Sequence, residues 1–306
     1  MAILRFLVPL ALIAILVFLV SRTDVHALRS AFSQVSIGHV IFGLLLVQVQ
    51  VVASALRWRF TAMRLGETIP ATVAVSEYYV ASFLNQTLPG GVAGDAIRAY
   101  RMRNAGNGGW KGPAKAVVFE RLSGQAAFFV LALSGLIAWP FVLGGEEAGR
   151  RASLLVLCFL MLVVTLGLVL VVFGHRSSRF RRIKEDVALV FLRRGALAIQ
   201  FGLSVLAVGS YVATFILASH AVGAPLPWIA ALTIIPLCLI AMLVPAGFGG
   251  WGTREAAAMA LWPLLGATQT EGLAASLVYG GLSLAGALPG LAIITLEAIR
   301  GRPRRA

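Results

Sequence analysis

The chain has 306 residues, of which 59% are apolar and only 12% are charged, and its formal net charge is +14. This composition excludes a water-soluble globular domain and is typical of an all-α polytopic membrane protein. The basic residues lie between apolar runs, where they set topology and meet anionic headgroups, so we do not expect nucleic acid as a partner.

Six segments are long and apolar enough to cross a bilayer as full spans. The first, residues 4–20, is not followed by a small-residue cleavage site, so we interpret it as a retained signal anchor. The other five are residues 38–56, 114–143, 152–173, 196–220 and 272–296. Two further apolar stretches, 70–95 and 228–266, are interrupted by Pro and Gly.

Basic clusters predict how these segments are oriented. They follow residues 38–56 and 70–95, fill the loop before residue 196 and end the chain, which places both termini in the cytoplasm. Because basic clusters flank 70–95 on both sides, we expect this stretch to be a re-entrant pair that returns to its own side. By parity, 228–266 enters from the opposite side. Re-entrant backbone needs surrounding protein or water, so a polar cavity between the two stretches is predicted.

The two interrupted stretches share a proline, two glycines and an arginine at equal spacings. The pattern reads Pro89-x-Gly91-x-x-Gly94-x-x-x-Arg98 in the first and Pro245-x-Gly247-x-x-Gly250-x-x-x-Arg254 in the second. The order of spans repeats with the same offset, and an odd number of spans per half inverts the second half. We therefore predict an inverted-topology repeat, residues 1–150 and 151–306, that together form one transmembrane domain.

Each copy of the pattern resembles a corner that could bind an anion. Gly91, Gly94, Gly247 and Gly250 allow the backbone to expose N–H groups, and a helix that begins there points its positive end at an anion. The arginine one turn later can hold phosphate with two parallel hydrogen bonds. The pattern alone is weak, since it is neither a Walker loop nor a Rossmann fingerprint.

Carboxylates accompany both arginines. Asp95 and Arg98 share a helix face, which leaves open a local ion pair or direct contact with a ligand. Arg254 and Glu255 are adjacent, so we expect them to point in different directions. Trp251 stands where Asp95 stands in the first copy, so the two corners are not equivalent.

Glu120 and Arg121 lie inside the span predicted at 114–143, where ionisable residues are functional candidates. The alternative is pairing within the protein, for example of Glu120 with Arg98 or Arg254. Asn85, Gln86, Gln48 and Gln50 are interpreted as hydrogen bonders between helices. Interfacial anchors are predicted at Trp110, Trp139, Trp228 and Trp262.

Residues that would hold a metal or perform covalent catalysis do not stand out in the sequence. The two cysteines, Cys158 and Cys238, lie in separate apolar runs, and the four histidines lack ligand spacing. No nucleophile–base motif is recognisable. We therefore expect no metal, no cofactor and no enzymatic activity, although nothing in the sequence excludes such activity.

Three segments together resemble a known family. They are FLNQTLPGGVAGDAIRAYRMR, AVVFERLSGQ and VPAGFGGWGTREAA, and nearly the whole chain resembles the lysylphosphatidylglycerol synthase transmembrane-region family. That family includes the flippase domain of the multiple peptide resistance factor. The resemblance implies a bacterial cytoplasmic-membrane protein that moves a polar-headgroup lipid between leaflets. It also implies that the cavity residues are Asp95, Arg98, Glu120, Arg121, Arg254 and Glu255.

The resemblance leaves several functions open. The soluble aminoacyl-transferring domain of the full-length synthases has no counterpart in this sequence, so lysyl transfer is not expected. The first hypothesis is a translocase for a phospholipid, glycolipid or hopanoid with an anionic or zwitterionic headgroup. The alternatives are a membrane-embedded transferase, which would change the mass of its substrate, and a non-transporting partner of lipid-biosynthesis enzymes. A homodimer is a further partner prediction.

Overall fold

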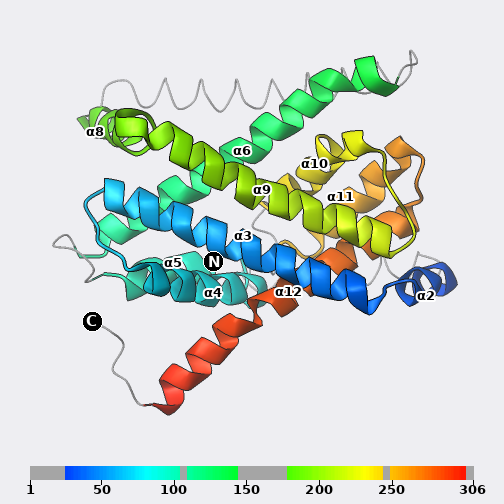
Figure 1. The fold of residues 1–306 in the computed structure, drawn as a ribbon, viewed down its shortest axis with the longest axis horizontal. Helices are drawn as coiled ribbons and strands as arrows, with labels where there is room; N and C mark the ends of the chain where they lie inside the picture. Colours follow the sequence, from blue (N-terminus) through cyan, green and yellow to red (C-terminus); the bar gives the residue numbers. More distant parts are fainter. Residues whose placement is uncertain (1–24, 104–108, 144–177, 244–248, 301–306) are drawn as a thin grey trace, which may run out of the picture.

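The computed structural model describes residues 25–103, 109–143, 178–243 and 249–300, which form helices and the turns between them (Figure 1). Four helices are long and apolar enough to cross a membrane. They are α3 (Ile37–Arg64), α6 (Lys111–Leu143), α9 (Ala196–Ala221) and α12 (Gln269–Ile299). They confirm a multi-pass helical architecture, while the spans predicted at 4–20 and 152–173 lie outside the described residues.

The first interrupted stretch folds as a helical hairpin of α4 (Ala71–Thr87) and α5 (Ala93–Arg101). Helix α4 ends just before Pro89, which has no N–H to donate, and Gly90 and Gly91 turn the chain with φ of 88° and 64°. Helix α5 packs so closely that a Cβ on Gly94 would collide with the carbonyl oxygen of Ala81. The hairpin therefore depends on glycine both at its turn and at its helix contact.

The second interrupted stretch forms another hairpin from four short helices. They are η3 (Trp228–Ala231), α10 (Ile234–Ala241), α11 (Thr253–Leu261) and η4 (Trp262–Leu265). Gly250 has a φ of 83°, whereas Gly94, at the same place in the repeated pattern, is helical. These two glycines of the repeated pattern thus differ in backbone conformation. Gly247 lies outside the described residues.

The hairpins come from opposite ends of the bundle (Figure 1). The first starts and finishes at the end where α3 stops and α6 begins, and the second at the end where α9 stops and α12 begins. Their tips meet, because a Cβ on Gly91 would lie 4.0 Å from the Cα of Gly249. The two hairpin tips are thereby brought together beside a cavity.

Three shorter helices lie beside the long ones, and arginines at one end of the bundle bind residues of neighbouring helices. The short helices are α2 (Val25–Ser33), α8 (Ser178–Val187), which continues as the π-helix η1 (Ala188–Leu192), and η2 (Arg193–Gly195). Arg101, which ends α5, pairs with Glu77 of α4 at 2.6 Å and with Glu297 of α12 at 2.9 Å. Arg64 donates to the carbonyl of Leu189 at 2.9 Å. Ion pairs and hydrogen bonds thus link helices that are distant in sequence.

Two predictions about individual residues are wrong. Arg57 belongs to the basic cluster predicted to follow the span at 38–56, but α3 continues to Arg64 and leaves Arg57 buried within it. Trp139 and Trp262 are buried in the core rather than at an interface, whereas Trp110 and Trp228 are exposed. In both cases a tertiary contact, not hydropathy, decides the environment.

Candidate functional site

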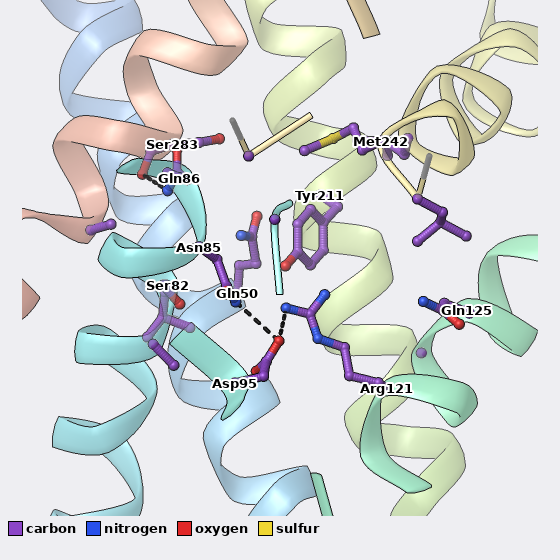
Figure 2. Close-up of a pocket in the computed structure, with 18 of the residues that line it drawn as sticks. Gln50, Ser82, Asn85, Gln86, Asp95, Arg121, Gln125, Tyr211, Met242 and Ser283 are labelled. Carbon is purple, nitrogen blue, oxygen red and sulfur yellow. Dashed lines mark hydrogen bonds and ion pairs between the residues drawn. The ribbon is translucent and has the colours of Figure 1, made fainter. Parts of the chain in front are cut away.

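A cavity of about 180 Å³ lies between the two hairpin tips and the long helices. Its charged lining residues are Arg57, Asp95, Glu120, Arg121 and Arg254, and Gly91 and Gly249 contribute the tips. Uncharged polar side chains, among them Gln50, Asn85 and Tyr211, face the same space (Figure 2). Polar groups from both hairpins and all four long helices therefore meet in one place.

Asp95 is held at the start of α5 by three side chains. Its carboxylate accepts from Arg98 Nη2 at 2.9 Å and from Asn85 Nδ2 at 3.1 Å, and it also pairs with Arg121 (Figure 2). Asn85 is fixed in turn, because its Oδ1 accepts from the N–H of Gly94 at 2.8 Å. Both the local ion pair and the interhelical role expected of Asn85 are present.

Glu120 of α6 joins two arginines from different helices. Its Oε1 accepts from Arg57 Nη2 at 2.7 Å and from the Tyr78 hydroxyl at 3.4 Å, and its Oε2 lies 3.4 Å from Arg98 Nη2. Only 1% of Glu120 is exposed. Of the two pairings considered from the sequence, the one with Arg98 is formed, and Arg57 rather than Arg254 is the second partner.

Arg98 lies behind the cavity wall rather than in it. Its guanidinium carbon sits 4.3 Å from the ring centre of Trp58 and 4.5 Å from that of Tyr78, and none of the residue is exposed. Two aromatic faces thus replace part of the water that a cation loses on burial. Its Nε and Nη1 have no hydrogen-bond partner within the described part of the chain. The geometry suits Arg98 to holding Asp95 and Glu120 in position.

The second hairpin carries its own buried ion pair. Arg254 Nη2 and Glu255 Oε1 are 2.5 Å apart, so the expectation that these neighbours point apart is wrong. Glu255 reaches back to the N–H of Gly252 at 2.6 Å, which directs its carboxylate toward the bent side chain of Arg254. Arg254 borders the cavity and contacts the rings of Trp251 and Tyr279.

Half of the predicted site residues border the cavity. Asp95, Glu120, Arg121, Arg254 and Gly91 line it, whereas Arg98, Glu255, Gly94 and Gly250 support it from behind. Within the described part of the chain, no three His, Cys, Asp or Glu side chains gather as metal ligands would. The site is therefore built from arginine–carboxylate pairs and amides.

The family model described as lysylphosphatidylglycerol synthase TM region matches residues 6–290. The chain belongs to the lysylphosphatidylglycerol synthase transmembrane-region family. A comparison with curated proteins found no match. Membership in a lysylphosphatidylglycerol synthase transmembrane-region family supports a membrane-lipid function, and the matched residues include the whole cavity.

Arg57 and Gln50 line the cavity, but the sequence did not predict them as site residues. A usable signal was present, since Gln50, Ser54, Arg57 and Thr61 recur at helical spacing and form one polar stripe on α3. All four are buried. A polar stripe inside an apolar helix indicates the face that meets other polar groups.

Replacing Ser276 by alanine is expected to destabilise the second hairpin by about 1.5–3 kcal/mol, the range for hydrogen bonds to charged groups. The Ser276 hydroxyl accepts from Arg254 Nε at 2.8 Å and donates to Glu255 at 2.9 Å, and it is fully buried. Unfolding by SDS in mixed micelles measures the change. Ser134→Ala, at an exposed position with a local bond to Leu131, is the matched control and should be near neutral. An equal effect at both sites would contradict the assigned role.

Proposed function

We propose that the chain is a translocase that moves a polar-headgroup lipid between the leaflets of the bacterial cytoplasmic membrane. The observation that carries the proposal is the charged cavity at the meeting point of the two hairpin tips. Outward-facing apolar residues on α3, such as Phe42 and Leu45, suit contact with acyl chains. A headgroup could occupy the cavity while its tails stay in lipid.

The proposed translocase has the membrane topology predicted from the sequence. The hairpins would be re-entrant elements of two inverted halves, residues 1–150 and 151–306, with six full spans and both termini in the cytoplasm. The opposite entry of the two hairpins supports this arrangement, because inverted repeats place discontinuous helices around a central site. Movement of one half against the other would open the cavity to each leaflet in turn. The proposed cycle contains no covalent step.

Reconstitution of the purified full chain into liposomes tests the proposed transport directly. Lipids with fluorescent tails are placed in both leaflets, and a membrane-impermeant reductant reports how much of each class becomes accessible from outside. We expect faster exchange of at least one polar-headgroup class than in protein-free liposomes. Folded protein that moves none of a broad set of phospholipids, glycolipids and hopanoids would contradict the proposal.

Replacing Gln50 by leucine is expected to slow transport several-fold without loss of stability. Gln50 lines the cavity and is 7% exposed, and its Oε1 has no hydrogen-bond partner among the residues that the structure describes. An apolar replacement therefore removes an unsatisfied group. The same change removes one polar contact available to a headgroup. Transport rates and SDS unfolding are measured side by side. Unchanged transport with a normal fold would show that this wall does not meet the substrate.

A further inference from the structure

The side chains that line the cavity or lie directly behind it carry one more positive charge than negative charge. Among the described residues, Arg57, Arg98, Arg121 and Arg254 face only Asp95, Glu120 and Glu255. Arg101, Glu77 and Glu297 form a separate cluster at one end of the bundle, where the side chain of Glu297 is 45% exposed. An unbalanced charge among buried groups is costly unless a counter-ion joins them.

Arg121 is the arginine that a ligand can reach. Its side chain is 37% exposed, whereas Arg98 and Arg254 are almost fully buried. Arg57 is also buried and binds Glu120 and Ser204. Among the described residues, Arg121 pairs with Asp95 alone, and its buried Nε has no hydrogen-bond partner among them. Figure 2 shows it extending from α6 across the cavity toward α5. Arg121 therefore combines access for a ligand with a single ion pair that can be exchanged.

Asp95 can release Arg121 without becoming an unpaired charge. Its other bonds, to Arg98 at 2.9 Å and to Asn85 at 3.1 Å, remain when Arg121 leaves. The amide of Gln50 offers a further polar contact close to the same place (Figure 2). The energetic barrier to exchange is thus limited to one ion pair, which an incoming anion replaces with another.

We propose that the cavity selects lipids whose headgroup is a phosphodiester with one net negative charge, and that this anion takes Arg121 from Asp95. This inference rests on the proposed function and names its substrate class. A phosphodiester presents two oxygens that match the planar guanidinium fork, and its single charge cancels the excess. A headgroup with an added amino group would restore the imbalance and is disfavoured.

Lipid binding to the purified full chain in detergent tests this proposal separately from transport. The probes are phosphatidylglycerol, zwitterionic phosphatidylcholine and an aminoacylated phosphatidylglycerol of net positive charge, all with the same tails, and native mass spectrometry measures the bound fraction. We expect phosphatidylglycerol to bind about tenfold or more tightly than the others, as for a charge-assisted pair. Equal binding of all three, or preference for the cationic lipid, would overturn the proposal.

Variants at Arg121 assign the preference to its side chain. Arg121→Gln should remove the preference, and Arg121→Lys should retain part of it, because lysine keeps the charge without the planar fork. Asp95→Asn should strengthen phosphatidylglycerol binding, since the competing carboxylate is gone. Arg103→Gln, which removes an arginine stacked on Tyr100 outside the cavity, is the control and should bind as the wild type does. A folded Arg121→Gln or Arg121→Lys variant with wild-type selectivity would refute the assignment.

Two further outcomes separate this inference from the proposed function. Selective binding through Arg121 without any exchange in liposomes would refute transport and leave the binding site standing. Transport that ignores headgroup charge would refute selectivity and leave the translocase standing. The soluble diester glycerophosphoglycerol should compete only weakly, and competition equal to that of the lipid would overturn a lipid as the ligand.

Discussion

Replacing Glu120 by glutamine is expected to lower the free energy of unfolding by about 3–5 kcal/mol, the cost of breaking a buried ion pair from one side. Glu120 is the only carboxylate that pairs with Arg57 in the described residues, and it also faces Arg98. Glutamine keeps the shape but leaves two buried arginines with less counter-charge. Transport should fall with stability, because the arginines behind the cavity lose their anchor. SDS unfolding in mixed micelles measures the first effect and liposome exchange the second.

Two controls make the Glu120 result specific. Glu297→Gln applies the same change to an ion pair whose carboxylate is 45% exposed, and its effect on stability should be close to zero. Adding Arg57→Gln to Glu120→Gln removes the unpaired cation, so the double variant should recover part of the lost stability. If Glu120→Gln and Glu297→Gln cost the same, the network around Glu120 is not the buried unit described above.

Replacing Gly94 by alanine is expected to destabilise the protein by about 1–3 kcal/mol and to disrupt the cavity. The added methyl group would meet the backbone of Ala81, and α4 cannot retreat because Gly290 of α12 packs just as closely against the carbonyl of Tyr79. The N–H of Gly94 also orients Asn85, so any separation of the hairpin misplaces Asp95. SDS unfolding and lipid binding should therefore change together.

Gly281→Ala is the matched control for Gly94→Ala. Gly281 lies in helix α12 at an exposed position, and nothing stands within 4 Å of an added Cβ. Alanine is the better helix former there, so stability should stay the same or rise by about 0.5–1 kcal/mol. A loss at Gly281 as large as at Gly94 would mean that helix contacts do not explain either result.

Hydropathy and glycine pattern were sufficient to predict the helical class, four long helices and the positions of the two interruptions. Spacing by three residues placed Asp95 and Arg98 on one helix face and made their ion pair, which the structure forms, one of two alternatives. These features depend on local sequence. The burial of Arg98 could not be predicted this way, because Trp58 and Tyr78, which enclose it, come from other helices.

Two errors have a common physical origin in long, flexible side chains. Arg57 was expected to flank the membrane because positive charge usually marks a loop, yet it pairs with Glu120 inside the bundle. Arg254 and Glu255 diverge at their Cβ atoms, but their long side chains bend until the charged ends meet. The direction of the Cα–Cβ bond therefore does not determine where the charged group of a long side chain lies.

The ion pairs of the first hairpin have a consequence for the order in which the chain assembles during synthesis. Helix α5 has nine residues and carries Asp95, Arg98 and Arg101, so it is too short and too charged to settle in lipid unaided. Glu120, which pairs with Arg98, is synthesised with α6. Glu297, which pairs with Arg101, is synthesised only with α12. The hairpin encoded early therefore reaches its final bonding only after the last described helix has been made.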